Sequence, residues 1–332
     1  MATADGAPFR VVEICAGGGG QSLGLERAGF AHAAAIEIDK HACATLRRNR
    51  PGWTVLEGDV RNFDGRAYNG IDLLAGGVPC PPYSVAGKQL GSADERDLFP
   101  EALRLVREAE PTAVMLENVR GFASAKFADY RAQLVKELNC LGYSVDWRVL
   151  NASDFGVPQL RPRFVLVAVR HRYANAFVWP EPQQATPSVG DAIGDLLASR
   201  SWPGAAAWME KARSIAPTIT GGSLKHGGPD LGPTRARAQW RLLGVDGMGL
   251  ADEPPGPEKP VDYLPRLTTR MVARLQGFPD DWSFAGGKTA IHRQVGNAFP
   301  PPVAEAVGRA IGAALTGQNK PRLQPRLLEL VG

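Results

Sequence analysis

Two residues whose side chains suit catalysis, a cysteine and a glutamate, lie at the ends of predicted strands. Cys80 lies in G-G-V-P-C-P-P-Y-S, directly after the apolar run I-D-L-L-A. Prolines on both sides of this thiol restrict φ and remove backbone donors, so the loop should be stiff and the sulfur should have a fixed direction. Because a free thiol is mostly protonated at neutral pH, a nucleophile also requires surroundings that stabilise the thiolate. The segment favours a cysteine nucleophile over a structural thiol, which would be expected inside an apolar run.

Glu117 ends another apolar run, V-M-L-E-N-V. A carboxyl group at the end of a buried strand tends to have a raised pKa, which allows it to donate a proton near neutral pH. The structural alternative is that Glu117 and Asn118 cap the helix that follows. Because the carboxyl ends of neighbouring parallel strands meet at one edge of a sheet, we expect the Cys80 thiol and the Glu117 carboxyl group to open into the same crevice.

A glycine-rich turn lies at the end of the first predicted strand, in E-I-C-A-G-G-G-G-Q-S-L-G. Glycines let the backbone turn sharply and approach a ligand closely. The dinucleotide pattern G-x-G-x-x-G is not met, which argues against a pyrophosphate ligand. Glu37 closes the second strand, where an acidic side chain can accept hydrogen bonds from ribose hydroxyls, and Asp59 follows the third. Together these positions predict a nucleoside pocket, although each acid alone also fits a helix cap or a turn.

These residues need strands to position them, and seven short apolar runs alternate with helical patterns up to about residue 170. Such alternation is typical of a mostly parallel sheet covered on both faces, so the sequence predicts a doubly wound α/β fold. From about residue 175 clean periodicity is lost, which predicts a smaller, loop-rich domain. We therefore expect a catalytic and cofactor-binding domain over 1–174, the smaller domain over 175–290, and a C-terminal segment over 291–332 that packs back on the first domain.

Composition narrows the class of protein. The chain has 332 residues with four cysteines, which form no regular framework, and five scattered histidines. This pattern predicts free thiols in a reducing compartment and suggests no metal site. No segment has the pattern of a membrane span or a secretory signal, so we expect a soluble intracellular protein.

Basic residues are concentrated between Arg200 and Val245. This span holds seven Arg and Lys residues against two acidic ones, a net charge of +5, whereas the net charge of the whole chain is +4. A basic span permits a polyanionic partner such as nucleic acid. A solvated basic face is the alternative, and charge alone does not decide between the two.

Taken in order, the motifs resemble those of the DNA cytosine-5 methyltransferases over nearly the whole chain. The resemblance lies in P-C-x-x-x-S, E-N-V, Q-L-R-P-R, L-Q-G-F-P and G-N, together with the glycine turn. It implies the S-adenosyl-L-methionine-dependent methyltransferase fold, in which the smaller domain recognises the target. It also implies methyl transfer to carbon 5 of a flipped cytosine in a specific duplex DNA sequence, through a covalent adduct at carbon 6.

The resemblance also implies roles for single residues. Cys80 would be the nucleophile, Glu117 the acid, and Arg161 and Arg163 the residues that hold the target base. The implied cofactor contacts come from Cys15, Gly17, Gly19, Glu37, Asp59 and Asn297. In addition, we expect Ser84, Lys88, Arg235 and Arg237 to bind DNA. The chain departs from the family pattern at Pro81, where Gln is frequent, and at Glu13, where Asp is commoner; neither change removes a reacting group.

The expected setting is a monomer acting on double-stranded DNA in the cytoplasm, at the nucleoid, with a functional link to a restriction or defence system. Two alternatives remain open. A transfer RNA cytosine-5 methyltransferase would use the same thiol chemistry, and a catalytically silent DNA-binding protein would keep the fold without the reaction. The recognised DNA sequence cannot be read from these residues, because base contacts depend on loop geometry and DNA shape.

Overall fold

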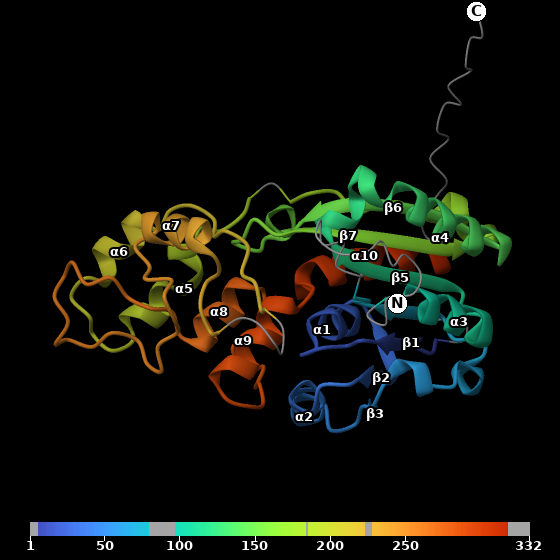
Figure 1. Cartoon of the computed structure of the whole chain (residues 1–332), viewed down its shortest axis with the longest axis horizontal. Coiled ribbons are helices and arrows are strands. Elements are labelled where there is room, and N and C mark those ends of the chain that lie inside the picture. Colours follow the sequence, from blue (N-terminus) through green and yellow to red (C-terminus); the bar gives the residue numbers. More distant parts are fainter. Residues whose placement is uncertain (1–5, 80–96, 184, 223–227, 318–332) are drawn as a thin grey trace, which may run out of the picture.

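The structure is a computed structural model, and it describes residues 6–79, 97–183, 185–222 and 228–317. Figure 1 shows two parts side by side: a sheet covered by helices, and a smaller group of helices. The strands are β1 (Phe9–Ile14), β2 (Phe30–Glu37), β3 (Val55–Glu57), β4 (Leu73–Gly76), β5 (Ala113–Val119), β6 (Tyr143–Asn151) and β7 (Pro162–Arg170). The helices are α1 (Gly20–Arg27), α2 (Lys40–Asn49), α3 (Phe99–Ala109), α4 (Ala128–Cys140), α5 (Val189–Ala198), α6 (Ala205–Lys211), α7 (Thr234–Leu242), α8 (Thr269–Leu275), α9 (Lys288–Asn297) and α10 (Pro301–Leu315).

The strands form one seven-stranded sheet in the order β3-β2-β1-β4-β5-β7-β6. The pairs from β3 to β5 are parallel, whereas β7 is antiparallel to both β5 and β6. Each of the seven predicted strands is present, and the predicted α/β fold is confirmed. The carboxyl ends of β1, β2, β4 and β5 meet at one edge, which is where a ligand binds in sheets of this kind.

Side chains on the strands alternate between two apolar cores, as the two-residue period of a strand requires. Leu74, Val114 and Leu116 belong to the core that includes α3 and α4. Leu73 and Met115 belong to the opposite core, which α1 and α10 close. Both faces of the sheet are therefore covered, the second of them by α1 and α10.

The smaller part, residues 189–275, is called the helical region below and contains α5, α6, α7 and α8. Its core includes Trp202, Trp208 and Trp240, each at most 4% exposed. The sequence predicted this part as loop-rich and missed α5, α6 and α7, because helices of 7–10 residues contain too few turns to show an apolar stripe. The domain boundaries themselves stay a prediction.

In the described part of the chain, no helix has both the length and the apolarity needed to cross a membrane.

Candidate active site

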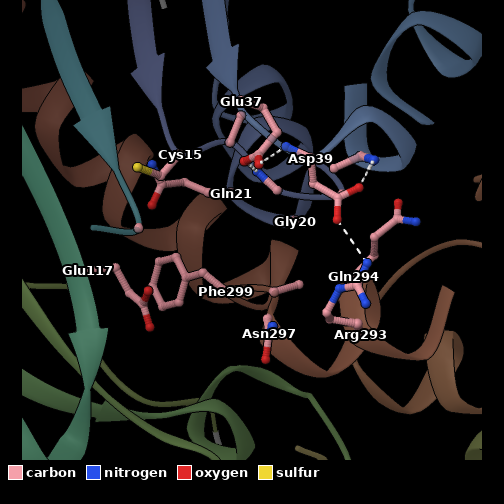
Figure 2. A pocket seen from close by; sticks show the side chains of 16 residues that line it. Cys15, Gly20, Gln21, Glu37, Asp39, Glu117, Arg293, Gln294, Asn297 and Phe299 are labelled. Atoms are coloured by element: carbon pink, nitrogen blue, oxygen red, sulfur yellow. Dashed lines mark hydrogen bonds and ion pairs between the residues drawn. The ribbon is translucent and has the colours of Figure 1, made fainter. Parts of the chain in front are cut away.

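A pocket opens at the carboxyl edge of the sheet, between the glycine turn and α9 (Figure 2). Its lining comes from five segments that are distant in sequence: the turn after β1, the end of β2, the end of β4, the end of β5, and the C-terminal half of α9 with the residues that follow it. The lining residues include Cys15, Gly17, Gly18, Gly20, Gln21, Glu37, Asp39, Gly77, Glu117, Arg293, Gln294, Asn297 and Phe299. The structure thus brings four of the six predicted cofactor residues, Cys15, Gly17, Glu37 and Asn297, into one pocket with the predicted acid.

The glycine turn requires glycine for two different reasons. Gly17 and Gly19 have φ angles of 56° and 88°, a region of backbone space that side chains disfavour. Gly20 begins α1, and a Cβ atom there would lie 2.3 Å from the carbonyl oxygen of Phe299. The first reason shapes the turn, and the second lets the segment before α10 lie against it. Gly17 lines the pocket, whereas Gly19 contributes the turn geometry from behind.

Glu37 is fixed by the backbone around it. Its Oε2 accepts a hydrogen bond from the Gly17 amide at 2.7 Å, and its Oε1 accepts from Ile38 and Asp39 at 2.9 and 2.8 Å. Burial raises the pKa of Glu37, and the three backbone hydrogen bonds oppose that rise. A carboxylate held in this way has a defined position and keeps further lone pairs for a ligand.

Asp39 and Arg293 line one side of the pocket and form an ion pair that the sequence analysis missed. Asp39 Oδ2 lies 2.9 Å from Arg293 Nη2, and both side chains are largely buried. Asp39 also caps α2 by accepting from the amides of His41 and Ala42. Burial alone would raise the pKa of Asp39, but the hydrogen bonds from Arg293, Ala42 and His41 lower it on balance. In the sequence, Asp39 could have been found from its position two residues after Glu37, at the end of the same strand. Arg293 has no such signal except that it directly precedes the motif Q-V-G-N.

Gln21 is a second lining residue that the sequence analysis did not single out. Its side chain is 4% exposed, and neither its amide nitrogen nor its amide oxygen has a hydrogen-bond partner in the part of the chain described. Buried amides in native proteins are nearly always paired, so the pocket wall contains polar groups that a bound molecule could satisfy. Together with the acid at Glu37, this wall fits a polar nucleoside such as S-adenosyl-L-methionine.

Three further predicted cofactor residues differ in their surroundings. Burial raises the pKa of the Cys15 thiol, so this lining cysteine is neutral and unsuited to be the nucleophile. Asn297 lines the pocket and donates through Nδ2 to the carbonyl oxygen of Gly222 at 3.2 Å. Asp59 lies outside the pocket lining and forms an ion pair with Arg61 at 2.8 Å. A contact with the cofactor would therefore require the Asp59 carboxylate to bind both Arg61 and the cofactor.

Glu117 and Arg163 form a buried ion pair beside the pocket. Arg163 Nε lies 3.0 Å from Glu117 Oε1, and the two side chains are 11% and 9% exposed. Burial raises the pKa of Glu117, while the positive charges of Arg163 and Arg161 oppose that rise. A carboxyl group with a raised pKa can hold a proton near neutral pH and donate it, which is what an acid catalyst needs.

The end of β4 is anchored directly beside Glu117. A Cβ atom on Gly77 would lie 3.3 Å from Glu117 Oε2, and Asn118 donates through Nδ2 to the carbonyl oxygen of Val78 at 2.9 Å. The polypeptide continues from there to Pro79. The predicted nucleophile Cys80 and the predicted DNA contacts Ser84 and Lys88 lie outside the described residues.

Arg161 has a different environment from Arg163. Its side chain is fully buried, and its guanidinium donates to the carbonyl oxygens of Ile219, Gly296 and Ala298 at 2.6, 2.6 and 2.9 Å. These three bonds join the sheet to the helical region and to α9. The predicted contact of Arg161 with the target base would require some of them to break, so the geometry favours a positioning role.

The two predicted DNA contacts in the helical region lie on α7. Arg235 is exposed, whereas Arg237 is half-buried and donates to Met248 Sδ at 3.2 Å. In the surrounding surface, other arginines pair with acids, as Arg200 does with Glu253 and Arg213 with Glu210. For those two, the interpretation as an ordinary solvated surface holds.

Comparison with known proteins agrees with this geometry. Residues 9–313 match the family model of the C-5 cytosine-specific DNA methylases. The chain is 56% identical to the Type II methyltransferase M.NaeI of Lentzea aerocolonigenes over 95% of its length and 77% of the relative's. It is 54% identical to the Type II methyltransferase M.NgoMIV of Neisseria gonorrhoeae, over 94% of this chain and 99% of that one.

Solved structures show the same fold. The crystal structure of a prophage-encoded DNA modification methyltransferase from E. coli is similar with a TM-score of 0.65 and 26% identity, covering 93% of this chain and 99% of that one. The S. pombe Dnmt2 methyltransferase matches in fold with a TM-score of 0.62 at 18% identity, over 94% of this chain and all of the other. From the family match and the two close relatives, the chain belongs to the C-5 cytosine-specific DNA methylases and is a DNA cytosine-5 methyltransferase.

Proposed function

We propose that this methyltransferase modifies one short duplex sequence, with Cys80 as the nucleophile, Glu117 as the acid and Arg163 as the residue that orients the target base. The observation that carries the assignment is the buried Glu117–Arg163 pair, of which Glu117 lines the same pocket as Glu37 and the glycine turn. An acid with a raised pKa, a fixed guanidinium and a nucleoside-type pocket at one sheet edge meet the requirements of the reaction.

The chemistry follows from the electronic structure of cytosine. Carbon 5 belongs to an aromatic ring and is a poor nucleophile. When the Cys80 thiolate bonds to carbon 6, Glu117 donates its proton toward N3, and the ring becomes an enamine whose carbon 5 can bond to an electrophilic methyl group. Loss of the proton from carbon 5 to water then breaks the carbon–sulfur bond and returns the thiolate, and the N3 proton returns to the Glu117 carboxylate, which restores the neutral aromatic ring and the acid. Arg163 would hold the base oxygen while this charge develops.

S-adenosyl-L-methionine supplies the methyl group when it is bound in the pocket. Glu37 would accept hydrogen bonds from the ribose hydroxyls, and Gln21 would pair its amide with a polar group of the cofactor. Asn297 and the glycine turn would form the opposite walls. Cys15 would contribute an uncharged surface, consistent with the raised pKa of its thiol.

The target base must leave the duplex to reach this pocket, at a cost of a few kcal/mol. We infer that Ser84, Lys88, Arg235 and Arg237 contact DNA and help to offset that cost. Because both close relatives are named Type II methyltransferases, we also infer that the enzyme protects DNA against a partner restriction nuclease. It would act as a monomer in the cytoplasm, at the nucleoid.

The two alternatives have less support. Close relatives named for a transfer RNA substrate would favour the first, but the two at 54–56% identity are named Type II methyltransferases. The buried Glu117–Arg163 pair argues against a catalytically silent DNA-binding protein. Burying an ion pair costs desolvation free energy, and DNA binding without catalysis does not require this pair.

The test is bisulfite sequencing of plasmid DNA from cells that express the protein. We expect 5-methylcytosine at one short motif, its complete loss in Cys80→Ala, and normal modification in the matched control Cys140→Ala, whose thiol is exposed at the end of α4. Purified protein should also form a covalent adduct with duplexes that contain 5-fluorocytosine when the methyl donor is present. Modification that persists in Cys80→Ala would contradict the assigned nucleophile.

A further inference from the structure

Helix α7 begins beside a loop that touches the active site. Gly232, two residues before α7, lies against this loop, because a Cβ atom there would be 3.4 Å from Thr220 Oγ1. On either side of Thr220, Ile219 accepts from Arg161 and Gly222 accepts from Asn297. The start of α7 is therefore connected through one short loop to a residue that lines the pocket.

One face of α7 is exposed and carries side chains of a particular kind. Arg235, Gln239 and Leu242 follow each other at i, i+4 and i+7, so they lie in one row along the helix, with the small Ala238 beside them. All four are exposed, and Leu242 is 76% exposed. On the opposite side, Trp240 is fully buried in the core of the helical region. The orientation of the helix is thus fixed by its core side. This row is called the exposed face of α7 below.

The charge on this face has no counterpart among the residues that the structure describes. Within the described part of the chain, Arg235 makes no hydrogen bond or ion pair, whereas Arg266 and Arg270 in the same region pair with Asp246 and Asp280. An apolar side chain as exposed as Leu242, on the same helix face as an unpaired guanidinium, is unfavourable in water but suits contact with a grooved polyanion.

The three residue types match the edges of DNA bases. Arg donates in pairs to guanine O6 and N7, Gln pairs with adenine N6 and N7, and an apolar side chain contacts the thymine methyl group. The major groove admits an α-helix, and the small Ala238 allows a close approach. Phosphate contacts alone would require only charge, and they would not explain Gln239 and Leu242.

We propose that the exposed face of α7 lies in the major groove and that Arg235 and Gln239 read base pairs of the recognition sequence. This inference rests on the proposed function and adds the residues that select the site. Through the loop around Thr220, a helix seated in the correct sequence would keep Asn297 and the pocket wall in place. A different sequence would leave Arg235 and Gln239 without partners, at the cost of lost hydrogen bonds.

The experiment compares wild type with Arg235→Ala, Arg235→Lys and Gln239→Ala on a library of duplexes in which each base pair of the methylated motif is varied. We expect Arg235→Ala to lower kcat/KM on the preferred motif roughly 10- to 100-fold and to remove the preference at one base pair only. Arg235→Lys keeps the charge but loses the paired donor geometry, so it should lose the same preference. Gln239→Ala should relax a different base pair.

The controls separate this inference from the other outcomes. Lys136→Ala removes one exposed charge on α4, at the far end of the molecule in Figure 1, and should leave specificity unchanged. Thermal unfolding and cofactor binding should be equal in all variants. If Arg235→Ala weakens methylation of every sequence equally and lowers the salt dependence by about one unit, while Arg235→Lys restores both, Arg235 contacts phosphate and the inference is wrong. Unchanged specificity in every variant would overturn it too, whereas a wild-type protein that methylates no duplex would overturn the proposed function instead.

Discussion

The sheet and the helical region hold their functional side chains in different ways. At the sheet edge, Glu37 is fixed by three backbone amides and Glu117 by a buried guanidinium. On α7, Arg235 and Gln239 point into solvent from a short helix whose position depends on Trp240. The comparison teaches that the proposed cofactor ligand and the proposed acid are each held by direct contacts with the surrounding protein, while the groups proposed to read DNA need only a rigid helix and side-chain ends that are free to contact DNA.

Between the two regions lies a buried polar junction. Gln159 Nε2 donates to Gln276 Oε1 at 2.8 Å and its Oε1 accepts from the Ile219 amide at 2.9 Å, next to the three carbonyls that Arg161 binds. Burial lowers the pKa of Arg161, but a guanidinium stays charged in proteins, so these carbonyls compensate a buried charge. The junction makes the relative position of pocket and reading helix depend on few residues.

The sharpest way to separate the regions is to remove the acid without changing shape. Glu117→Gln should lower kcat by about 10²- to 10⁴-fold and leave sequence-specific DNA binding unchanged, because Gln cannot donate a carboxyl proton. Since the folded pKa of Glu117 is raised, its proton is present at low pH and is lost as pH rises through that pKa. The alkaline decline of kcat/KM caused by this group should therefore vanish in the variant, as a pH–rate profile would show. An alkaline decline identical to wild type would mean that another group supplies the proton.

Breaking the junction should affect both regions at once. Arg161→Ala should lower the free energy of unfolding by about 3–5 kcal/mol, because it leaves several buried carbonyls without a donor. DNA binding and cofactor binding should weaken together. Arg270→Ala, which removes an exposed ion pair in the helical region, is the control and should cost at most about 1 kcal/mol. Denaturant unfolding measures the change in stability, and titrations with DNA and with the cofactor measure the two affinities. If the affinity for only one of the two ligands falls, the junction is not shared by both regions.

A change in the helical core should affect one region more than the other. Trp240→Ala should destabilise by about 3–5 kcal/mol through the cavity it creates, and it should weaken DNA binding more than cofactor binding. Trp240→Phe should cost less, because the Trp240 Nε1 atom has no hydrogen-bond partner among the described residues and Phe removes that unpaired donor. Titration calorimetry with DNA and with the cofactor would give the two affinities of each variant. Equal weakening of both ligands would show that the regions are not separable in this way.

The smallest expected effect concerns the Asp39–Arg293 pair. Asp39→Asn keeps the cap of α2 but removes the charge, so it should weaken cofactor binding several-fold with little loss of stability. Asp39→Ala loses the cap as well and should cost about 1 kcal/mol more. Because the folded pKa of Asp39 is lowered, the stability from its ionised form is present above the unfolded pKa and is lost as pH falls through the folded pKa. Denaturant unfolding at acidic and neutral pH would test the stability, and titration calorimetry would test cofactor binding. Binding by both variants that is as tight as in the wild type would remove the pair from the cofactor site.

The sequence predicted the sheet region far better than the helical region, for a physical reason. Strand ends carry local signals: an apolar run followed by a polar residue located Glu37 and Glu117. By contrast, the Asp39–Arg293 pair joins residues 254 positions apart, and Gln159 meets Gln276 across 117 positions. Contacts of that kind depend on how distant helices and strands pack together, and no short sequence motif predicts that packing. The helix α7 was missed because three arginines in nine residues leave no apolar stripe, although Trp240 anchors it.

Because β7 runs antiparallel to β5, its first residues lie at the same edge of the sheet as the carboxyl ends of the parallel strands. Arg163 is the second residue of β7 and pairs in register with Val119, the last residue of β5. Had β7 run the other way, its first residues would lie at the far rim, about 20 Å from the Glu117 carboxylate for strands of this length. A slip of one position would turn the guanidinium to the other face. The connection from β6 to β7 therefore sets the alignment of the acid with its guanidinium partner. Because it also holds the buried junction residues Gln159 and Arg161, a change in its length should lower stability as well as activity.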